Sequence, residues 1–154
     1  MPVFELIAGT FKEGESIPKQ HTCEGEDRSP PLRWNHPPDG TRSFVLIADD
    51  PDAPGSTWVH WVLFNIPIDV RGLAEGLPLQ EVLPNDAHQG MNDFHRVGYG
   101  GPCPPPGTPH RYYFTLYALD RELSLKPKST KAQVVEAMKG HVLAEAQVMG
   151  RFGR

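Results

Sequence analysis

Proline restricts the fold of this chain more than any other feature, because each proline removes a backbone hydrogen-bond donor and clashes with the preceding turn of a helix. The 154 residues include 17 prolines and 15 glycines. Together they make up about a fifth of the chain, against about 12% in an average protein. Long helices are therefore excluded over most of the sequence, and the composition favours short β-strands joined by turns.

Length and charge narrow the class of protein. A chain of 154 residues has the size of one domain, residues 1–154, whose core is large enough to fold without metals. We expect no cofactor and no metal. The net charge of −4 argues against nucleic-acid binding, which depends on lysine and arginine that neutralise phosphates. We therefore expect no nucleic-acid partner.

The location and the redox state are predicted from the N-terminus and the cysteines. No apolar run reaches the roughly 20 residues of a membrane-spanning helix, and the start, Met1 to Glu5, has an acid and no base, unlike a secretory signal. We expect no stable membrane insertion and a cytoplasmic location. Cys23 and Cys103 form no C-x-x-C pair for zinc. The sequence does not show whether they meet, and in a reducing cytoplasm we expect free thiols.

Three segments have the composition of strands. Residues 43–48 are apolar and β-branched and end at a dense turn signal, and residues 57–66 are apolar on both faces, as in a central buried strand. Residues 110–119 form an aromatic strand with His110 and Tyr112 on one face and Arg111 on the other. Residues 71–109 contain turn-forming residues throughout, and so long a loop in a small domain is typically functional.

One helix is predicted near the C-terminus. Thr130 and Gln133 fit a capping box, and apolar residues recur at near-helical spacing until Gly150: Val134, Met138, Val142 and Met149. Strands first and one helix last predict an all-β fold, a β-sandwich with one C-terminal α-helix.

Four residues at predicted strand ends could surround a small anion: Asp50, His60, His110 and Tyr112. Imidazole N–H and tyrosine O–H groups bind phosphate oxygens, and a carboxylate fixes a histidine tautomer. Arg111 faces away from His110, so we expect a structural, buried ion pair with Asp49 or Asp52. The remaining histidines are predicted to lie on the surface: His21, His36, His88, His95 and His141.

Other interpretations of these residues stay open. Each residue also fits an ordinary structural role, in the core for His60 and Tyr112 and in a turn for Asp50. Two histidines and one carboxylate could bind a metal, and Cys103 could form a thiolate pair with a histidine. The glycine-rich segment 98–107 lacks the Lys-Ser/Thr of a nucleotide-phosphate loop, and no G-x-S-x-G nucleophile motif occurs.

Several motifs, taken together, resemble the phosphatidylethanolamine-binding protein family, which includes the Raf kinase inhibitor proteins. They occur in the family's order: Thr22-Cys23-Glu24-Gly25, Ser29 to Trp34, Asp50-Pro51-Asp52-Ala53-Pro54, Trp58-Val59-His60-Trp61, Gly100-Gly101-Pro102 and His110-Arg111-Tyr112. The resemblance covers nearly the whole chain. The segment 140–146 is similar to the short bacterial and archaeal branch, whose members are often dimeric, so we expect a homodimer.

The resemblance implies a Greek-key antiparallel β-sandwich whose pocket binds phosphate and phosphoryl headgroups. The family's binding positions fall on Asp50, Trp58, His60, Gly101, Pro102, His110 and Tyr112. We therefore predict a binding protein for a small anion or a phosphoryl headgroup, not an enzyme, with a kinase or a protease as a partner that it inhibits or modulates. Two alternatives stay open. One is a phosphoester or phosphoryl-transfer enzyme that uses His60 or His110, and the other is a protein inhibitor with a vestigial pocket.

Overall fold

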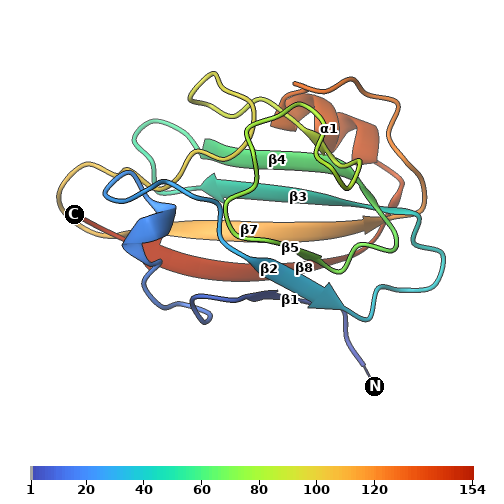
Figure 1. Cartoon of the computed structure of the whole chain (residues 1–154), viewed down its shortest axis with the longest axis horizontal. Coiled ribbons are helices and arrows are strands. Elements are labelled where there is room, and N and C mark those ends of the chain that lie inside the picture. Colours follow the sequence, from blue (N-terminus) through green and yellow to red (C-terminus); the bar gives the residue numbers. More distant parts are fainter. Residues whose placement is uncertain (1) are drawn as a thin grey trace.

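Two antiparallel β-sheets pack face to face in the computed structural model, which describes residues 2–154 (Figure 1). The small sheet has the order β1-β2-β5, with β1 (Glu5–Ala8), β2 (Leu32–Asn35) and β5 (Gly72–Leu73). The large sheet has the order β6-β4-β3-β7-β8, with β6 (His88–Gln89), β4 (Trp58–Pro67), β3 (Ser43–Asp50), β7 (His110–Leu119) and β8 (Val142–Phe152). The helical elements are η1 (Lys19–His21) and α1 (Lys131–Met138). The predicted all-β sandwich is confirmed.

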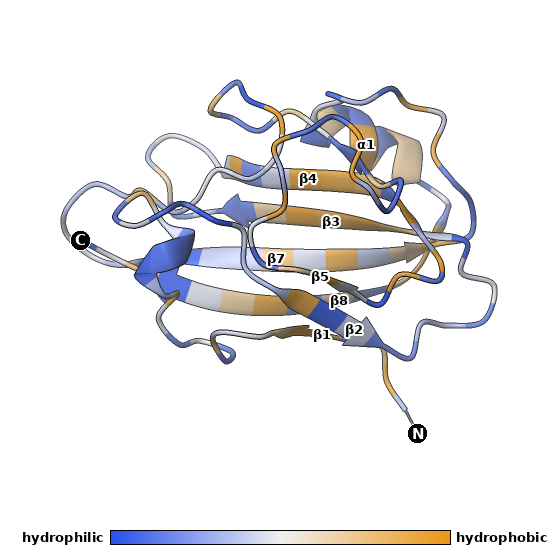
Figure 2. Cartoon of the chain, viewed as in Figure 1, coloured by the Kyte–Doolittle hydropathy of each residue, from blue (hydrophilic) through white to orange (hydrophobic). Residues whose placement is uncertain are grey.

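The central strands of the large sheet, β3 and β4, are buried on both faces. Along β3, Phe44, Leu46 and Ala48 pack against the small sheet, whereas Val45 and Ile47 join a second cluster with the apolar side of α1. Figure 2 shows the mostly apolar colouring of β3 and β4. Burial on both faces explains why these segments are apolar throughout, without polar residues at alternate positions.

A β-bulge in β4 interrupts this alternation beside the end of β3. Trp61 pairs with Ala48 and Val59 pairs with Asp49, so His60 is the extra residue. The bulge lets Trp61 pack in the core between the sheets and Val59 pack on the α1 side, although only one residue separates them. Bulges often re-aim a side chain next to a functional site, and here the bulged residue is His60.

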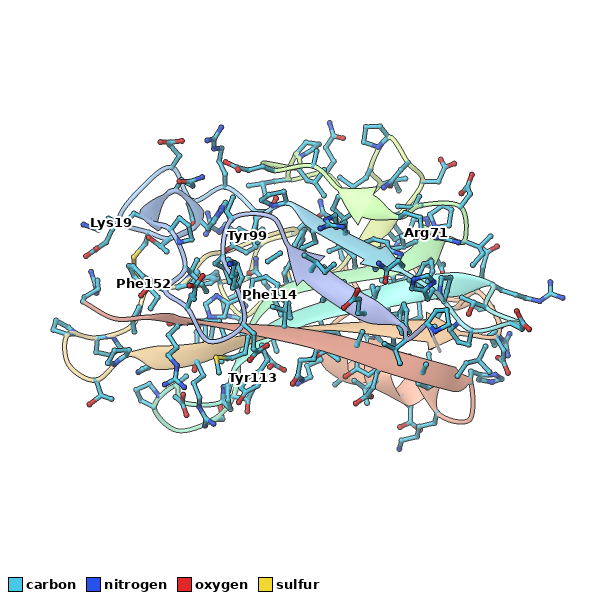
Figure 3. The ribbon with its side chains drawn as sticks, turned by 90° about the horizontal axis from the view of Figure 1, so that it is seen from below. Lys19, Arg71, Tyr99, Tyr113, Phe114 and Phe152 are labelled. Atoms are coloured by element: carbon cyan, nitrogen blue, oxygen red, sulfur yellow. A yellow bond between two sulfur atoms is a disulfide. The ribbon has the colours of Figure 1, made fainter. Side chains whose placement is uncertain are left out.

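The predicted C-terminal helix is only partly correct. Its capping box between Thr130 and Gln133 is present, but α1 ends at Met138, and the expected continuation to Gly150 is wrong. The chain turns at Gly140, which has a φ of 81°, and β8 then pairs antiparallel with β7 along nearly its whole length. The side chains of Ala146, Val148 and Phe152 are buried at intervals of two or four, which is the period of a strand. Figure 3 shows the same alternation in β7, where Phe114 points between the sheets and Tyr113 lies on the outer side.

Two further predictions are wrong. Cys23 and Cys103 are not free thiols but form a disulfide with a Cα–Cα distance of 5.4 Å, which joins the loop after η1 to the loop before β7. His21 is not on the surface. Its buried ring bonds to Arg28 O through Nδ1 at 2.8 Å and to Thr10 Oγ1 through Nε2 at 2.8 Å. His36 and His95 are exposed, and His88 and His141 are half-buried.

The long segment 71–109 contains only the short strands β5 and β6 but is held by specific bonds. The side chain of Gln89 accepts a hydrogen bond from Trp61 Nε1 at 2.9 Å and donates to the carbonyls of Pro78 and Gln80 at 2.8 Å each. A buried amide therefore fixes this loop to the core. Neither helix in the described part of the chain is long and apolar enough to cross a bilayer.

Candidate functional site

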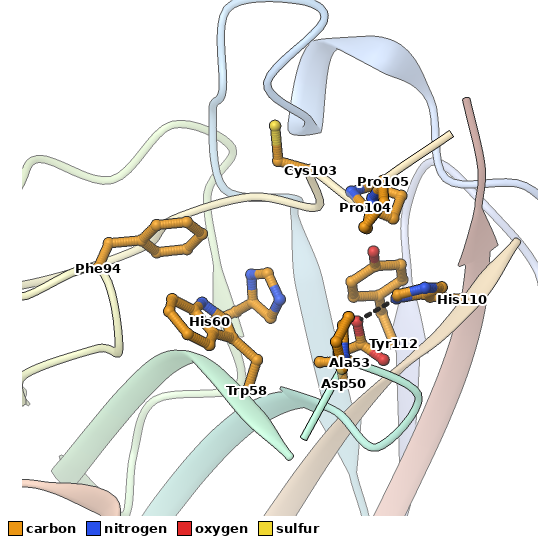
Figure 4. A pocket seen from close by; sticks show the side chains of 11 residues that line it. Asp50, Ala53, Trp58, His60, Phe94, Cys103, Pro104, Pro105, His110 and Tyr112 are labelled. Carbon is orange, nitrogen blue, oxygen red and sulfur yellow. Dashed lines mark hydrogen bonds and ion pairs between the residues drawn. The ribbon is translucent and has the colours of Figure 1, made fainter. Parts of the chain in front are cut away.

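A cavity of about 340 Å³ opens where β3 and β4 meet the start of β7 (Figure 4). The long loop and the turn after β3 form the rest of its wall. The lining residues are Asp50, Ala53, Pro54, Trp58, His60, Phe94, Cys103, Pro104, Pro105, His110 and Tyr112. A few polar groups thus converge in a mostly apolar hollow, which is typical of small-molecule sites.

The structure brings five of the seven predicted binding residues together around this cavity: Asp50, Trp58, His60, His110 and Tyr112. Gly101 and Pro102 do not line it. The Gly101 N–H donates to Asp27 Oδ1 at 2.9 Å, and the Pro102 carbonyl accepts from the Cys23 N–H at 3.1 Å. A Cβ atom on Gly101 would lie 2.2 Å from the His21 carbonyl oxygen. The structure therefore gives these two residues the role of holding the cavity wall.

Asp50 orients His110. The Nδ1–H of His110 donates to Asp50 Oδ2 at 2.7 Å, and the other carboxylate oxygen accepts from the Asp52 N–H at 2.7 Å. Asp50 is only 3% exposed, and both of its carboxylate oxygens accept hydrogen bonds from other residues of the protein. Figure 4 shows this bond, and the Nε2 atom of His110 has no hydrogen-bond partner among residues 2–154.

A backbone carbonyl fixes the proton position of His60. Its Nδ1 lies 2.6 Å from the Gly100 carbonyl oxygen, and because a carbonyl only accepts, Nδ1 must carry the proton. Burial lowers the pKa of His60, despite the opposing effects of this hydrogen bond and of the nearby carboxylates of Asp50 and Asp27. The imidazole is therefore neutral near pH 7, and its Nε2 is an acceptor.

Aromatic rings enclose the two imidazoles. The Tyr112 ring centroid lies 5.2 Å from that of His60 and 6.4 Å from that of His110. Phe94 packs edge-on against both His60 and Trp58, at 5.5 and 5.4 Å. Burial raises the pKa of Tyr112, so its phenol stays protonated and can donate a hydrogen bond.

Sequence reasoning missed the remaining lining residues. Ala53 and Pro54 belong to the turn motif that follows Asp50, so the motif itself could have included them. Phe94, in the long loop, carries no comparable signal. Pro104 and Pro105 reach the cavity because the disulfide at Cys103 fixes the loop that contains them.

The predicted ion pair of Arg111 is made with Asp52, not with Asp49. Nε and Nη2 of Arg111 contact the two carboxylate oxygens at 2.9 and 2.8 Å, and its backbone N–H adds a third bond at 2.9 Å. Asp49 instead pairs with Lys131 at 2.7 Å. The expected burial is wrong, since the side chains of Arg111 and Asp52 are 44% and 29% exposed. The hydrogen bonds with Arg111 lower the pKa of Asp52 to about 2.

Replacing Arg111 with leucine is expected to return the pKa of Asp52 from about 2 toward its ordinary value of 3.8. A lowered carboxyl pKa stabilises the folded state at pH values above the pKa of the unfolded state. The variant should therefore be less stable than the unmodified protein at pH 7, and the difference should vanish as the pH falls from about 4 to about 2. The loss should be small, since the pair is partly exposed. NMR titration of the carboxylate and unfolding curves against pH measure both effects. An unchanged Asp52 pKa in Arg111→Leu would contradict the assignment.

One alternative interpretation of the residues loses its basis. Cys103 is bonded to Cys23 and cannot supply a thiolate. Among residues 2–154, no cluster of three or more histidine, cysteine, aspartate or glutamate side chains is arranged to hold a metal ion.

The fold is a two-layer sandwich, and two histidines, a tyrosine and an aspartate converge in a cavity at its strand ends. These features define a class, the β-sandwich proteins with a pocket at the strand ends. Residues 8–153 match the family profile described as phosphatidylethanolamine-binding protein. The chain belongs to the phosphatidylethanolamine-binding protein family.

Relatives and solved structures agree with this assignment. A UPF0098 protein of Methanothermobacter thermautotrophicus is 51% identical over 97% of this chain and 98% of its own length. A UPF0098 protein of Aquifex aeolicus is 48% identical over 99% of this chain and 90% of its own length. Among crystal structures, YbcL of E. coli, described as a member of the mammalian family, is 36% identical with a TM-score of 0.92, and the match covers 98% of each chain. A homologue from Chlamydia trachomatis is 40% identical with a TM-score of 0.89 over 98% of this chain and 97% of its own.

Proposed function

We propose that this protein binds a small ligand through a phosphoryl group held in the cavity, and that it acts by binding rather than by catalysis. The observation that carries the proposal is the Asp50–His110 hydrogen bond of 2.7 Å, which fixes a histidine ring in the wall of a mostly apolar hollow. A protonated His110 there is an imidazolium whose charge is balanced by Asp50, and its Nε2–H would donate to an anionic oxygen. The Tyr112 hydroxyl is a second donor on the same wall.

The cavity size also suits this class of ligand. About 340 Å³ accommodates a headgroup such as phosphorylethanolamine but not the acyl chains of a lipid. Tryptophan, phenylalanine and proline side chains line the rest of the hollow and would contact the apolar part of the ligand. The names of the family and of YbcL point to phosphatidylethanolamine-type ligands for those proteins.

Calorimetric titration with phosphorylethanolamine and with inorganic phosphate tests the proposal. Removing a charge-assisted hydrogen bond in His110→Ala should weaken binding about 10- to 100-fold. His141→Ala is the matched control, because His141 makes the same kind of contact with Asp120, at 2.8 Å, and does not line the cavity. The proposal fails if the unmodified protein binds neither compound at millimolar concentration, or if the two variants bind equally well.

A second candidate is a phosphoester hydrolase, which one observation favours. A histidine oriented by a buried carboxylate is also the arrangement of a general base. Turnover of p-nitrophenyl phosphate that disappears in His110→Ala, but not in His141→Ala, would establish this alternative. The predicted homodimer, the kinase or protease partner and the cytoplasmic location stay predictions.

A further inference from the structure

We propose that His60 makes the cavity selective for phosphoryl groups that carry a hydroxyl, because its unprotonated Nε2 faces the ligand and accepts a hydrogen bond. The preferred class is then the singly charged phosphate monoester, with one P–O–H, over a phosphodiester of the same charge. This inference rests on the proposed function and adds the specificity of the same cavity.

The tautomer of His60 is fixed by the backbone around it. Its Nδ1–H donates to the Gly100 carbonyl at 2.6 Å, while the Gly100 N–H donates back to the His60 carbonyl at 3.0 Å. The residues that follow are also held in place: the Gly101 N–H donates to Asp27, and Cys103 is bonded to Cys23. The Gly100 carbonyl therefore has little freedom to move away, and the proton stays on Nδ1.

The ring of His60 is also unable to turn over freely. The side chains of Tyr112 and Phe94 pack edge-on against it at centroid distances of 5.2 and 5.5 Å, and the residue is only 5% exposed. A turn of the ring by 180° would replace the Nδ1–H by a carbon and break the bond to Gly100. The Nε2 edge therefore remains directed toward the cavity, as Figure 4 shows.

Nε2 of His60 has no hydrogen-bond partner among residues 2–154, and a buried acceptor that a ligand leaves unpaired weakens binding of that ligand. The charged and titratable groups around the ring are Asp50 and Asp49 at the end of β3, Asp27 in the loop after η1, and His110 and Tyr112 on β7. The carboxylates favour a protonated His60, but desolvation outweighs them and lowers its pKa. His60 thus meets the ligand as an acceptor.

The opposite wall supplies the donors. The Tyr112 hydroxyl can bond to an anionic phosphoryl oxygen, and so can His110 Nε2 when the ring is in its imidazolium form. None of the described residues that line the cavity is a lysine or an arginine. With the Asp50 carboxylate also present, a singly charged ligand is better accommodated than a doubly charged one. A monoester monoanion satisfies both walls, since it presents an O–H to His60 and oxygens to His110 and Tyr112.

Methyl phosphate and dimethyl phosphate form the direct test. At pH 5 both carry about one negative charge, because the second pKa of a phosphate monoester is about 6, but only methyl phosphate has a P–O–H. We expect methyl phosphate to bind about 10- to 100-fold more tightly by calorimetry. In His60→Phe, which keeps a ring and removes the acceptor, the difference should fall to within a few fold, and in His141→Phe it should persist.

The outcomes separate this inference from the proposed function. Equal binding of the two esters to the unmodified protein, or a preference that survives His60→Phe, overturns the selectivity and leaves phosphoryl binding intact. Binding of neither ester overturns both. Because His60→Phe leaves the Gly100 carbonyl without a donor and could fail to fold, ¹⁵N NMR of the unmodified protein provides a second measurement. At pH 5, the pH of the titrations, it should show a protonated Nδ1 and an unprotonated Nε2 that shifts only with methyl phosphate. The reverse tautomer, or a doubly protonated ring at that pH, would contradict the inference.

Discussion

Reducing the Cys23–Cys103 disulfide is expected to lower the free energy of unfolding by about 4 kcal/mol. The bond closes a loop with a sequence separation of 80 residues, and the chain-entropy treatment of such a cross-link gives about 4 to 5 kcal/mol for loops of this length. Denaturant unfolding with and without dithiothreitol measures the change. The double variant Cys23→Ala, Cys103→Ala is the control, since its stability should match that of the reduced protein and should not respond to dithiothreitol.

The reduced protein should keep its fold, because hydrogen bonds hold the same two loops together. The Cys23 N–H bonds to the Pro102 carbonyl, and the Gly101 N–H bonds to Asp27. The cavity wall should loosen, however, because Cys103 and the prolines that follow it line the cavity. An unchanged unfolding midpoint after reduction would show that the disulfide adds no stability.

Replacing Trp61 with alanine is expected to lower the free energy of unfolding by about 3 to 5 kcal/mol. Its ring is fully buried between the sheets and packs edge-on against Tyr99, with centroids 5.3 Å apart. The substitution also leaves Gln89 Oε1 without its donor, and Gln89 is the residue that fixes the long loop. The long loop should therefore also become less ordered, visible as faster exchange of the Leu83 and Gln89 amides, which donate to the carbonyls of Ala87 and Glu81.

Trp58→Ala is the matched control for this experiment. Trp58 lies three residues earlier in β4 but is 36% exposed at the cavity, so the same deletion removes much less buried surface. We expect its unfolding midpoint to change far less than that of Trp61→Ala. Similar losses in the two variants would mean that Trp61 does not have the central place in the core that the structure gives it.

The strands of the sheet centre could be predicted because their signal is local. Residues 43–48 and 57–66 are continuous apolar runs, and the observed β3 and β4 differ from these ranges by at most two residues at an end. The bounds of β7, residues 110–119, were predicted correctly. At β8 the same reasoning failed, because Val142 and Met149 also fit helical spacing, and only pairing with β7 decides in favour of a strand.

The site was predictable to the extent that it lies at strand ends. His110 and Tyr112 share a face of one strand by period alone, and Asp50 closes the strand beside it, so their meeting follows from strand pairing. The place of Phe94 in the cavity wall could not be predicted from the sequence, because no local pattern determines where a residue of a long irregular loop lies. The proton position of His60 could not be predicted either, because it depends on the Gly100 carbonyl, 40 residues further along the chain.

The sequence by itself determined the all-β class, the central strands, the helix cap and the set of polar residues at the strand ends, because these depend on neighbours within a few residues. The tertiary structure was needed to show that Cys23 meets Cys103, that His21 is buried, that Gly101 bonds to Asp27, and that His60 lies at a bulge beside the cavity. Each of these joins segments distant in sequence, and their distances are set by how the two sheets and their loops pack together. Local composition carries no information about that packing.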